Sequence, residues 1–239
     1  TPVTDRKLHV ATPNYDMLAE YAFAQADIKY INGFYGGIVR KFDWEQSGRA
    51  VTYADKTPVG KKIKIISREH RHIRLYKVHG SLNWFLINDE LIENNSWLYT
   101  TPEDNVERFI ITPGLSKYEK LHNFRNQLLG EYDKAVEKHN CFLFLGFGFR
   151  DNQLLNKTFV NKLKHQKSNG LIITKENNSE IDSLLEEAEN LWLVCQGESE
   201  NDTIIKNNKY SKPLLLKNEK LWEVDIFTKT ILGGYIREN

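Results

Sequence analysis

The 239-residue chain has little cysteine, little glycine and proline, and almost no net charge. Its two cysteines, Cys141 and Cys195, cannot build a disulfide framework or a four-thiolate zinc site. The 14 glycines and 6 prolines are too few for a collagen-like or low-complexity chain. Lys plus Arg is 33 and Asp plus Glu is 32, so the formal charge is +1. Any nucleic-acid surface therefore has to be a local patch.

A long hydrophobic run is also missing. The longest apolar stretch, Cys141 to Phe149, is far shorter than the roughly 20 residues that cross a bilayer. With no signal peptide and few cysteines, we expect a cytoplasmic protein without membrane contact. The chain opens at Thr1 without an initiator Met and enters a strand pattern at Leu8, so we expect a piece of a longer polypeptide.

Helix and strand patterns alternate between residues 117 and 194. Apolar residues recur at helical spacing over 117–139, and the run 142–145 predicts a strand that is buried on both faces. We expect Asp151 to cap a second helix that contains Leu155, and Ser179 with Asp182 to form the capping box of a third. The other strands are expected at 171–174 and 191–194. This order predicts an α/β fold, a Rossmann-like doubly wound parallel sheet with helices on both faces.

The rest of the chain is less regular. Residues 8–12 predict a strand, and the following helix carries Met17, Leu18, Tyr21 and Ala22 on one face. Residues 32–70 predict an insertion of loops and short strands, 73–78 another strand, and Leu221 to Ile231 a closing helix. We expect one domain over 1–205 and a C-terminal extension over 206–239.

Three polar or glycine-containing segments follow predicted strands, where open α/β sheets bind ligands. The first runs from Thr12 through Pro13 and Asn14 to Asp16. The Asn14 amide can donate to and accept from a sugar hydroxyl or a water. Both Asn14 and Asp16 can equally well serve only to cap the next helix.

The second segment is His79-Gly80-Ser81, after the strand that ends at Val78. An imidazole takes up a proton near neutral pH, which suits a general base. A histidine that only makes structural hydrogen bonds remains an alternative. Trp84 and Phe85, which come next, are typical of a core or a pocket wall.

The third segment is Gly146-Phe147-Gly148, which leads to Asp151. Glycines at this place let backbone amides approach a phosphate or a ribose at a helix N-terminus. Two glycines do not make the full dinucleotide fingerprint, and a tight turn between strand and helix uses the same residues.

Other patterns favour simpler explanations. His70 and His72 have no acidic or thiol cluster near them in the sequence, so we expect no metal. Residues 61–77 hold seven Lys or Arg against one acid, Glu69, which suits a nucleic-acid or partner patch or a solvated face. Residues 176–202 are acidic. The absence of Gly-x-Ser-x-Gly gives no support to a serine hydrolase.

Taken together, the segments resemble the sirtuin-like NAD-hydrolysing domains of bacterial anti-phage defence proteins. The resemblance covers about residues 8–195 and includes the order of the segments, which are listed from the N-terminus as Thr12 to Asp16, Gly33-Phe34-Tyr35-Gly36, Lys77-Val78-His79-Gly80-Ser81 with Asn83-Trp84, Leu145 to Phe149 with Asp151, and Leu171 to Glu176.

The resemblance implies an enzyme that hydrolyses NAD to nicotinamide and ADP-ribose. It implies that Asn14 positions the nicotinamide ribose and a water, that His79 acts as the base toward a ribose hydroxyl, and that Asp16 helps to hold this geometry. It places further contacts to NAD at the remaining strand-end residues, namely Thr12, Pro13, Gly80, Ser81, Gly146, Phe147, Gly148, Asp151, Thr174 and Glu176.

The chain departs from the family at two points. The family's glycine-rich phosphate loop precedes the Asn motif, whereas no glycine here precedes Gly33. We therefore expect that loop upstream of Thr1, and weak NAD binding by this piece alone. The four zinc cysteines of protein-deacylating sirtuins are also missing. An NAD-dependent deacylase is thus the second candidate, and a non-catalytic NAD or ADP-ribose-binding module the third.

The family also suggests partners. We expect a homo-oligomer, with a HerA-type ATPase as a candidate partner, and contact with nucleic acid only indirectly, if at all.

Overall fold

The computed structural model describes residues 6–100, 105–111, 118–151, 154–165 and 168–233. The chain divides into two compact units, Thr1–Asp133 (unit 1) and Lys134–Asn239 (unit 2). The boundary falls inside one long helix, α3 (Tyr118–Lys138). The predicted division into residues 1–205 and 206–239 stays a prediction.

Unit 1 contains a three-stranded parallel sheet of order β1-β7-β2. Its strands are β1 (Lys7–Thr12), β7 (His72–Lys77) and β2 (Tyr30–Ile31). β1 and β7 are in register from Lys7 opposite His72 to Thr12 opposite Lys77. The predicted strands at 8–12 and 73–78 are therefore confirmed, and they are neighbours.

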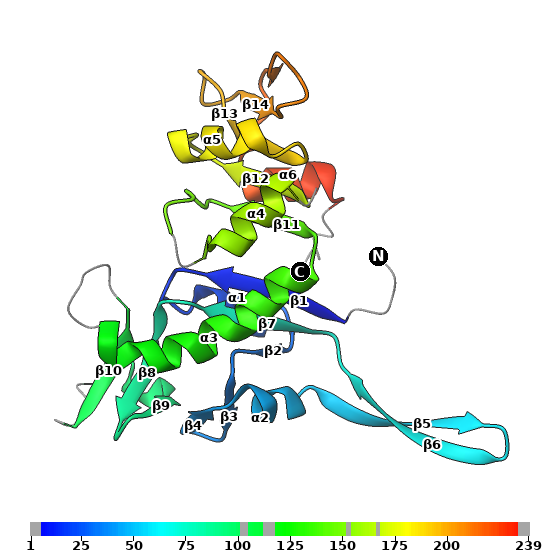
Figure 1. Cartoon of the computed structure of the whole chain (residues 1–239), viewed down its shortest axis with the longest axis vertical. Coiled ribbons are helices and arrows are strands. Elements are labelled where there is room, and N and C mark those ends of the chain that lie inside the picture. The colour runs from blue at the N-terminus through cyan, green and yellow to red at the C-terminus, as the bar shows by residue number, and fades with distance from the viewer. Residues whose placement is uncertain (1–5, 101–104, 112–117, 152–153, 166–167, 234–239) are drawn as a thin grey trace. The chain divides into compact units, whose positions relative to one another are not determined.

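Helices lie on both faces of this sheet (Figure 1). The ring of Tyr76 lies 5.3 Å from Trp44 of α2 (Trp44–Arg49) and 6.0 Å from Tyr132 of α3. Lys77, whose side chain points to the opposite face, pairs with Glu20 of α1 (Leu18–Gln25). Glu20 is the buried residue of α1. Leu18 and Tyr21, which the sequence placed on one apolar face of this helix, are exposed instead.

A five-stranded antiparallel sheet completes the core of unit 1, in the order β10-β8-β9-β4-β3. Its strands and the adjoining 3-10 helix are β3 (Phe34–Gly36), β4 (Arg40–Phe42), β8 (Gly80–Ile87), β9 (Glu90–Glu93), η1 (Asn95–Trp97) and β10 (Val106–Ile110). Phe34, Trp84, Phe109 and Leu128 form the centre of its apolar core. Trp84 and Phe85 are thus core residues, as one of the sequence alternatives had it.

A two-stranded ribbon, β5 (Thr52–Val59) with β6 (Lys62–Glu69), projects from the rest of unit 1 (Figure 1). Ile63 and Ile65 of this ribbon are largely exposed, although they are apolar. The segment predicted as loops and short strands therefore includes two eight-residue strands as well as α2.

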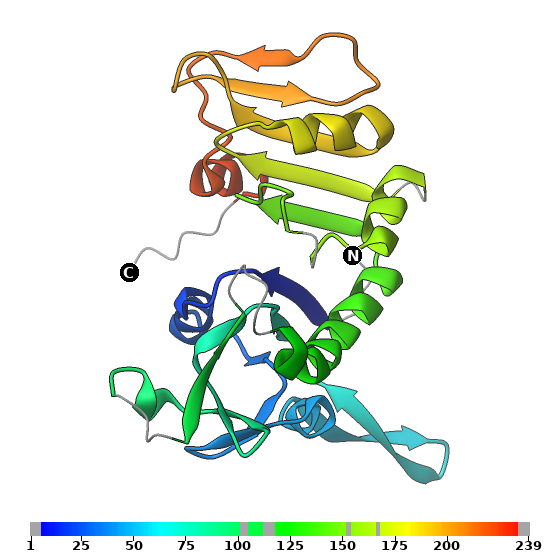
Figure 2. The ribbon, with the colours of Figure 1, turned by 60° about the vertical axis from the view of Figure 1, so that its left-hand side comes forward.

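Unit 2 is built on a five-stranded sheet, and its first three strands run in parallel (Figure 2). They are β11 (Cys141–Leu145), β12 (Asn169–Thr174) and β13 (Leu191–Gln196). β14 (Thr203–Lys206) and β15 (Leu214–Leu216) extend the sheet in antiparallel fashion. The three predicted strands are confirmed, whereas the sequence predicted neither β14 nor β15.

Both faces of this sheet are covered. Ile172 and Ile173 point to opposite faces, and each is at most 1% exposed. Ile173 packs with Phe227 of α6 (Val224–Ile231), the predicted closing helix. On the other face, Gly170 approaches Leu163 of α4 (Lys157–His165). With α5 (Ser179–Glu187) between β12 and β13, the strands and helices confirm the predicted α/β class with helices on both faces.

Three local predictions in unit 2 are wrong. α4 begins at Lys157 rather than after Asp151, because Asn156 Oδ1 accepts from Phe159 N at 2.8 Å and caps the helix. Asn178 caps α5 by accepting from Ile181 N, so Ser179 already belongs to the helix. β11 is not buried on both faces, since it is an edge strand whose Leu143 and Leu145 are about half exposed.

None of the helices in the described ranges combines the length and the apolar character that a membrane span requires.

Candidate functional site

The first two predicted site segments lie side by side in unit 1. Thr12 and Lys77 are paired at the carboxyl ends of β1 and β7, and Val78 N donates to Thr12 O at 3.4 Å. Further along, Leu82 N donates to Tyr15 O at 2.9 Å. The structure therefore brings the backbones that carry Asn14 and His79 to the same edge of the parallel sheet.

The loop that follows β1 leaves the Asn14 side chain available. Asn14 is exposed, and of its groups only the backbone N–H is hydrogen-bonded within the described chain, to Thr12 Oγ1 at 3.1 Å. Pro13 between them is half-buried. Asp16 Oδ1 accepts from Leu18 N at 3.0 Å, at the start of α1. The capping alternative thus describes Asp16, and it does not describe the Asn14 amide.

The turn between β7 and β8 holds His79, which is half-buried. Its backbone carbonyl accepts from Ile111 N at 2.8 Å. Gly80 has a φ of +83°, in the region that favours glycine. Ser81 is fully buried, and its Oγ accepts from Lys77 Nζ at 2.7 Å. Gly80 and Ser81 therefore shape the turn that carries His79.

Unit 2 brings together a second group of predicted residues, at the carboxyl ends of β11 and β12. Gly146 N donates to Ile173 O at 2.9 Å, and Asn178 Nδ2 donates to Gly148 O at 3.1 Å. Thr174 Oγ1 donates to Glu176 O at 3.2 Å. The sequence predicted that the glycine segment lies at the N-terminus of the helix that follows it. Because Asn178 caps α5 and also contacts Gly148, the segment lies beside the N-terminus of α5.

The other residues of this segment are in turn-like positions. Phe147 contacts Phe149, with ring centroids 5.1 Å apart. Asp151 Oδ1 accepts from Leu154 N at 3.3 Å. The roles that the sequence assigned to these residues, as to Asn14 and His79, stay predictions.

A buried polar cluster that the sequence did not predict lies in unit 1. Glu93 accepts from Asn32 at 3.0 Å and from Arg40 at 2.9 Å through Oε2, and from Asn83 at 3.0 Å through Oε1. Burial raises the pKa of Glu93, against the opposing effect of Arg40. Burial and the nearby Glu93 carboxylate also raise the pKa of Tyr30 to about 12. β9 carries two glutamates, and nothing in the local sequence distinguishes the buried Glu93 from the exposed Glu90.

The basic run 61–77 does not form one patch. Lys77 is buried, and the Arg74 guanidinium lies 5.9 Å from the Trp44 ring and pairs with Glu131. Lys61 follows β5, and Lys62, Lys64 and Arg68 belong to β6 of the ribbon. Arg68 pairs with Asp55 at 2.6 Å.

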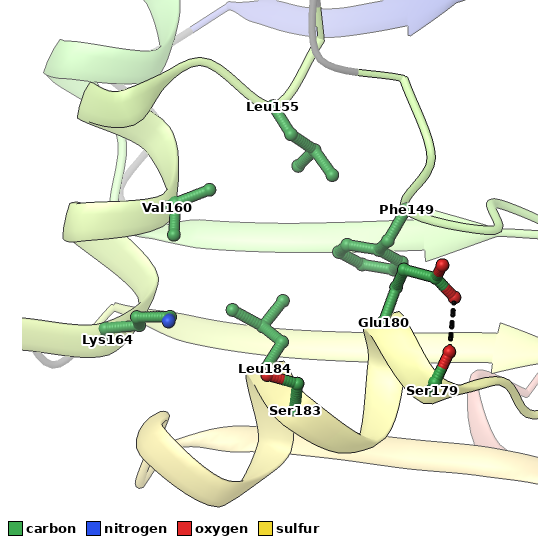
Figure 3. Close-up of a pocket in the computed structure, with 8 residues that line it drawn as sticks. All are labelled: Phe149, Leu155, Val160, Lys164, Ser179, Glu180, Ser183 and Leu184. Atoms are coloured by element: carbon green, nitrogen blue, oxygen red, sulfur yellow. Dashed lines mark hydrogen bonds between the residues drawn. The ribbon is translucent and has the colours of Figure 1, made fainter.

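A pocket of about 360 Å³ lies in unit 2 beside α4 and α5 (Figure 3). Phe149, Leu155 and Leu184 form much of its apolar wall, and Glu180, which accepts from Ser179 Oγ at 3.1 Å, lies at its edge. None of the predicted site residues lines it. The described ranges also contain no group of three or more His, Cys, Asp and Glu side chains that could hold a metal ion.

Two comparisons with known proteins complete the description. Over 50 residues, the chain is 38% identical to the elongation factor P (R)-beta-lysine ligase of Buchnera aphidicola subsp. Schizaphis graminum. That similarity covers 21% of this chain and only 15% of the ligase. The family model of the SIR2-like domain, by contrast, matches residues 8–194, which include both groups of strand-end residues. The chain therefore belongs to the SIR2-like domain family, and this membership supports a sirtuin-like function that uses NAD.

Proposed function

We propose that the chain is an NAD glycohydrolase, which hydrolyses NAD to nicotinamide and ADP-ribose. The observation that carries this proposal is the placement of the Asn14 loop and the His79 turn at one edge of the β1–β7 sheet. Open α/β sheets bind ligands at the carboxyl ends of their strands. The family match supports NAD as the ligand.

The donor set suits a ribose. The exposed Asn14 amide donates to one oxygen and accepts from another, so it can hold a ribose hydroxyl and a water together. An imidazole can accept a proton, which a carboxamide cannot do, so His79 rather than Asn14 is the candidate base. Asp16 starts α1 and thereby keeps the loop in place.

In the proposed reaction, water adds to C1′ of the nicotinamide ribose while the bond from C1′ to the pyridinium nitrogen breaks. The electron pair of that bond goes to the ring nitrogen, which loses its positive charge. His79 takes the proton of a ribose hydroxyl, that hydroxyl takes a proton from the adding water, and His79 then releases its proton to solvent. Positive charge develops on the sugar, as in other glycosyl cleavages. Because nicotinamide leaves as a neutral molecule, the site needs no general acid for it.

The strand-end group of unit 2 is proposed to contact the nucleotide. Gly146 N and Gly148 O are already hydrogen-bonded within unit 2, but neither glycine has a side chain that would keep a ligand away from the rest of its backbone. Thr174 follows Ile173, the partner of Gly146, and contacts Glu176. Thr174→Val and Glu176→Gln are expected to raise the KM for NAD several-fold with little change in kcat, since neither residue takes part in bond cleavage. Steady-state kinetics of nicotinamide release measure both constants.

The central test is nicotinamide release from NAD, measured by chromatography with and without an acetylated peptide. His79→Ala is expected to lower kcat by about 10²–10⁴-fold, the range typical of a lost acid-base group. Asn14→Ala is expected to lower kcat by about 10²-fold, because the ribose and the water lose the group that positions them. Asn161→Ala and His165→Ala are matched controls, because they remove the same groups from exposed positions of α4. Full activity of both Asn14→Ala and His79→Ala would falsify the assigned roles.

The same assay separates the other candidate functions. Release that requires the peptide identifies a deacylase. NAD binding without release, by the wild-type chain, identifies a non-catalytic NAD or ADP-ribose-binding module that partners a nucleic-acid ATPase.

We further propose that the activity depletes NAD in the bacterial cytoplasm during phage infection, as part of anti-phage defence. The assembly is proposed to be a homo-oligomer, with a HerA-type ATPase as a candidate partner. Cells that express the wild-type chain with its partner should lose NAD after infection, whereas cells with His79→Ala should keep it. Equal NAD levels in the two strains throughout infection contradict the proposal.

A further inference from the structure

Lys77, the last residue of β7, is 1% exposed, although lysines are almost never fully buried unless they are paired. Its Nζ donates to Glu20 Oε1 at 2.8 Å, to Ser81 Oγ at 2.7 Å and to the backbone carbonyl of Asp16. An ammonium group has three protons to donate. Lys77 therefore directs them to three different segments, namely α1, β8 and the loop after β1.

These contacts join the two halves of the candidate site in unit 1. The carbonyl of Asp16 lies two residues after Asn14, and the hydroxyl of Ser81 lies two residues after His79. Ser81 Oγ in turn donates to Tyr15 O at 3.4 Å. One buried ammonium group thus sets the spacing between the loop that carries Asn14 and the turn that carries His79.

Stability alone does not account for this arrangement. The desolvation penalty of a buried ion pair is comparable to its electrostatic gain, and an apolar pair of similar volume is often as stable. The second carboxylate oxygen of Glu20 is also buried, and it has no hydrogen-bond partner among the residues that the structure describes. What the pair supplies, and an apolar pair does not, is a set of fixed directions from one nitrogen to three acceptors.

We propose that Lys77, held in place by Glu20, is a positioning residue that sets the Asn14 amide and the His79 imidazole at the separation needed for NAD cleavage. Its effect on catalysis rests on the proposed function. Its effect on the loop and the turn is independent of that function and can be measured separately.

The test replaces both charges at once, with Lys77→Met and Glu20→Leu in the same chain. The double variant leaves no unpaired buried charge, so we expect it to fold. Its kcat for nicotinamide release should fall about 100-fold, because a displacement near 1 Å is enough for such a loss. The KM for NAD should change by less than about threefold, since the other contacts to NAD remain.

Two further variants make the result specific. Lys162→Met is the matched control, because Lys162 of unit 2 is also a buried lysine and donates to three backbone carbonyls. At a temperature where it is folded, its kcat should equal that of the wild type. Lys77→Arg keeps the charge but cannot direct one nitrogen to three acceptors, so it should fold and lose kcat. It replaces the double variant if that chain does not fold.

Hydrogen exchange measures the positioning without relying on activity. The amides of Leu18 and Leu82, which are bonded to Asp16 and Tyr15, should exchange at least about tenfold faster in the double variant. Amides of the β1–β7 pairing should exchange at the wild-type rate. Unchanged exchange of Leu18 and Leu82 overturns the proposal, as does an unchanged kcat in an active protein. A wild-type chain that releases no nicotinamide refutes the proposed function instead, and the exchange rates still decide the role of Lys77.

Discussion

Gly80 is the first residue of β8, and the structure predicts how far a single added methyl group at this position would destabilise the chain. Its φ is +83°, and it pairs with Ile110 just after a shift in the register of β8 and β10. A Cβ at this position would overlap the carbonyl oxygen of Phe109 and lie 3.1 Å from the carbonyl carbon. Both atoms belong to the backbone of a paired strand, so they cannot move away without disturbing the sheet.

Two contributions determine the expected loss. An alanine in the left-handed region costs about 1–2 kcal/mol relative to its preferred conformations. Overpacking against a neighbour that cannot move typically costs about 1–3 kcal/mol. We therefore expect Gly80→Ala to lower the free energy of unfolding by about 2–5 kcal/mol. For a chain of this size, the melting temperature should fall by roughly 5–15 °C.

Gly60→Ala separates the two contributions. Gly60 lies in the turn of the ribbon with a φ of +61°, and a Cβ there would have no atom within 4 Å. This variant therefore carries only the conformational cost. Urea denaturation followed by tryptophan fluorescence should show that Gly80→Ala is the less stable of the two by about 1–3 kcal/mol. Equal losses in the two variants would refute the steric argument for Gly80.

Other predictions concern buried polar and thiol groups. Burial raises the pKa of Glu93 above 4.5 in the folded chain. The free energy of unfolding of the wild type, relative to that of Glu93→Gln, should therefore fall as the pH rises from about 4.5 through the raised pKa. Urea titrations at several pH values measure this difference, and a difference that stays constant with pH contradicts the prediction. Cys141 is exposed, whereas Cys195 is buried with a raised pKa, so a thiol reagent should modify one cysteine in the folded chain and both in denaturant. Rapid modification of both in the folded chain would be inconsistent with this structure. Lys162→Met should lower the free energy of unfolding, measured by urea denaturation, by about 2–4 kcal/mol, because three carbonyls at the end of α3 lose their hydrogen-bond donor. A loss under about 0.5 kcal/mol would show that water replaces the lysine as donor.

The alternation of strands and helices from β11 to β13 was predictable, because each of these elements has a recognisable hydrophobic pattern of its own. The strands β11, β12 and β13 are continuous apolar runs, as expected for parallel strands that are flanked by helices. Polar residues separate them from the helices. The exact starts of α4 and α5 were not predictable, because several residues near each start can cap a helix. Asn156 and Asn178 cap these helices, the role that the sequence assigned to Asp151 and Ser179.

The errors in unit 1 have a different cause. The apolar face of α1 is exposed and Glu20 is buried, because the partner of Glu20 is a lysine 57 positions away. Likewise, Ile63 and Ile65 stand exposed on the ribbon, against the usual tendency of isoleucine to be buried. No local sequence pattern predicts a long-range ion pair or a ribbon that projects from its unit, so only the structure shows these features.

One part of the candidate site was predictable from the sequence, and another part was not. The strand ends that carry Asn14 and His79 were predictable, because parallel strands place their carboxyl ends at one edge of a sheet. Lys77 was counted in the sequence as one of seven basic residues in a run, where surface exposure is the usual explanation. Its burial follows from its register, since the residue opposite Thr12 in β7 lies directly beneath the loop that holds Asn14. A basic residue at the end of a buried strand, just before a candidate catalytic residue, is therefore better assigned to the support of that site than to the protein surface.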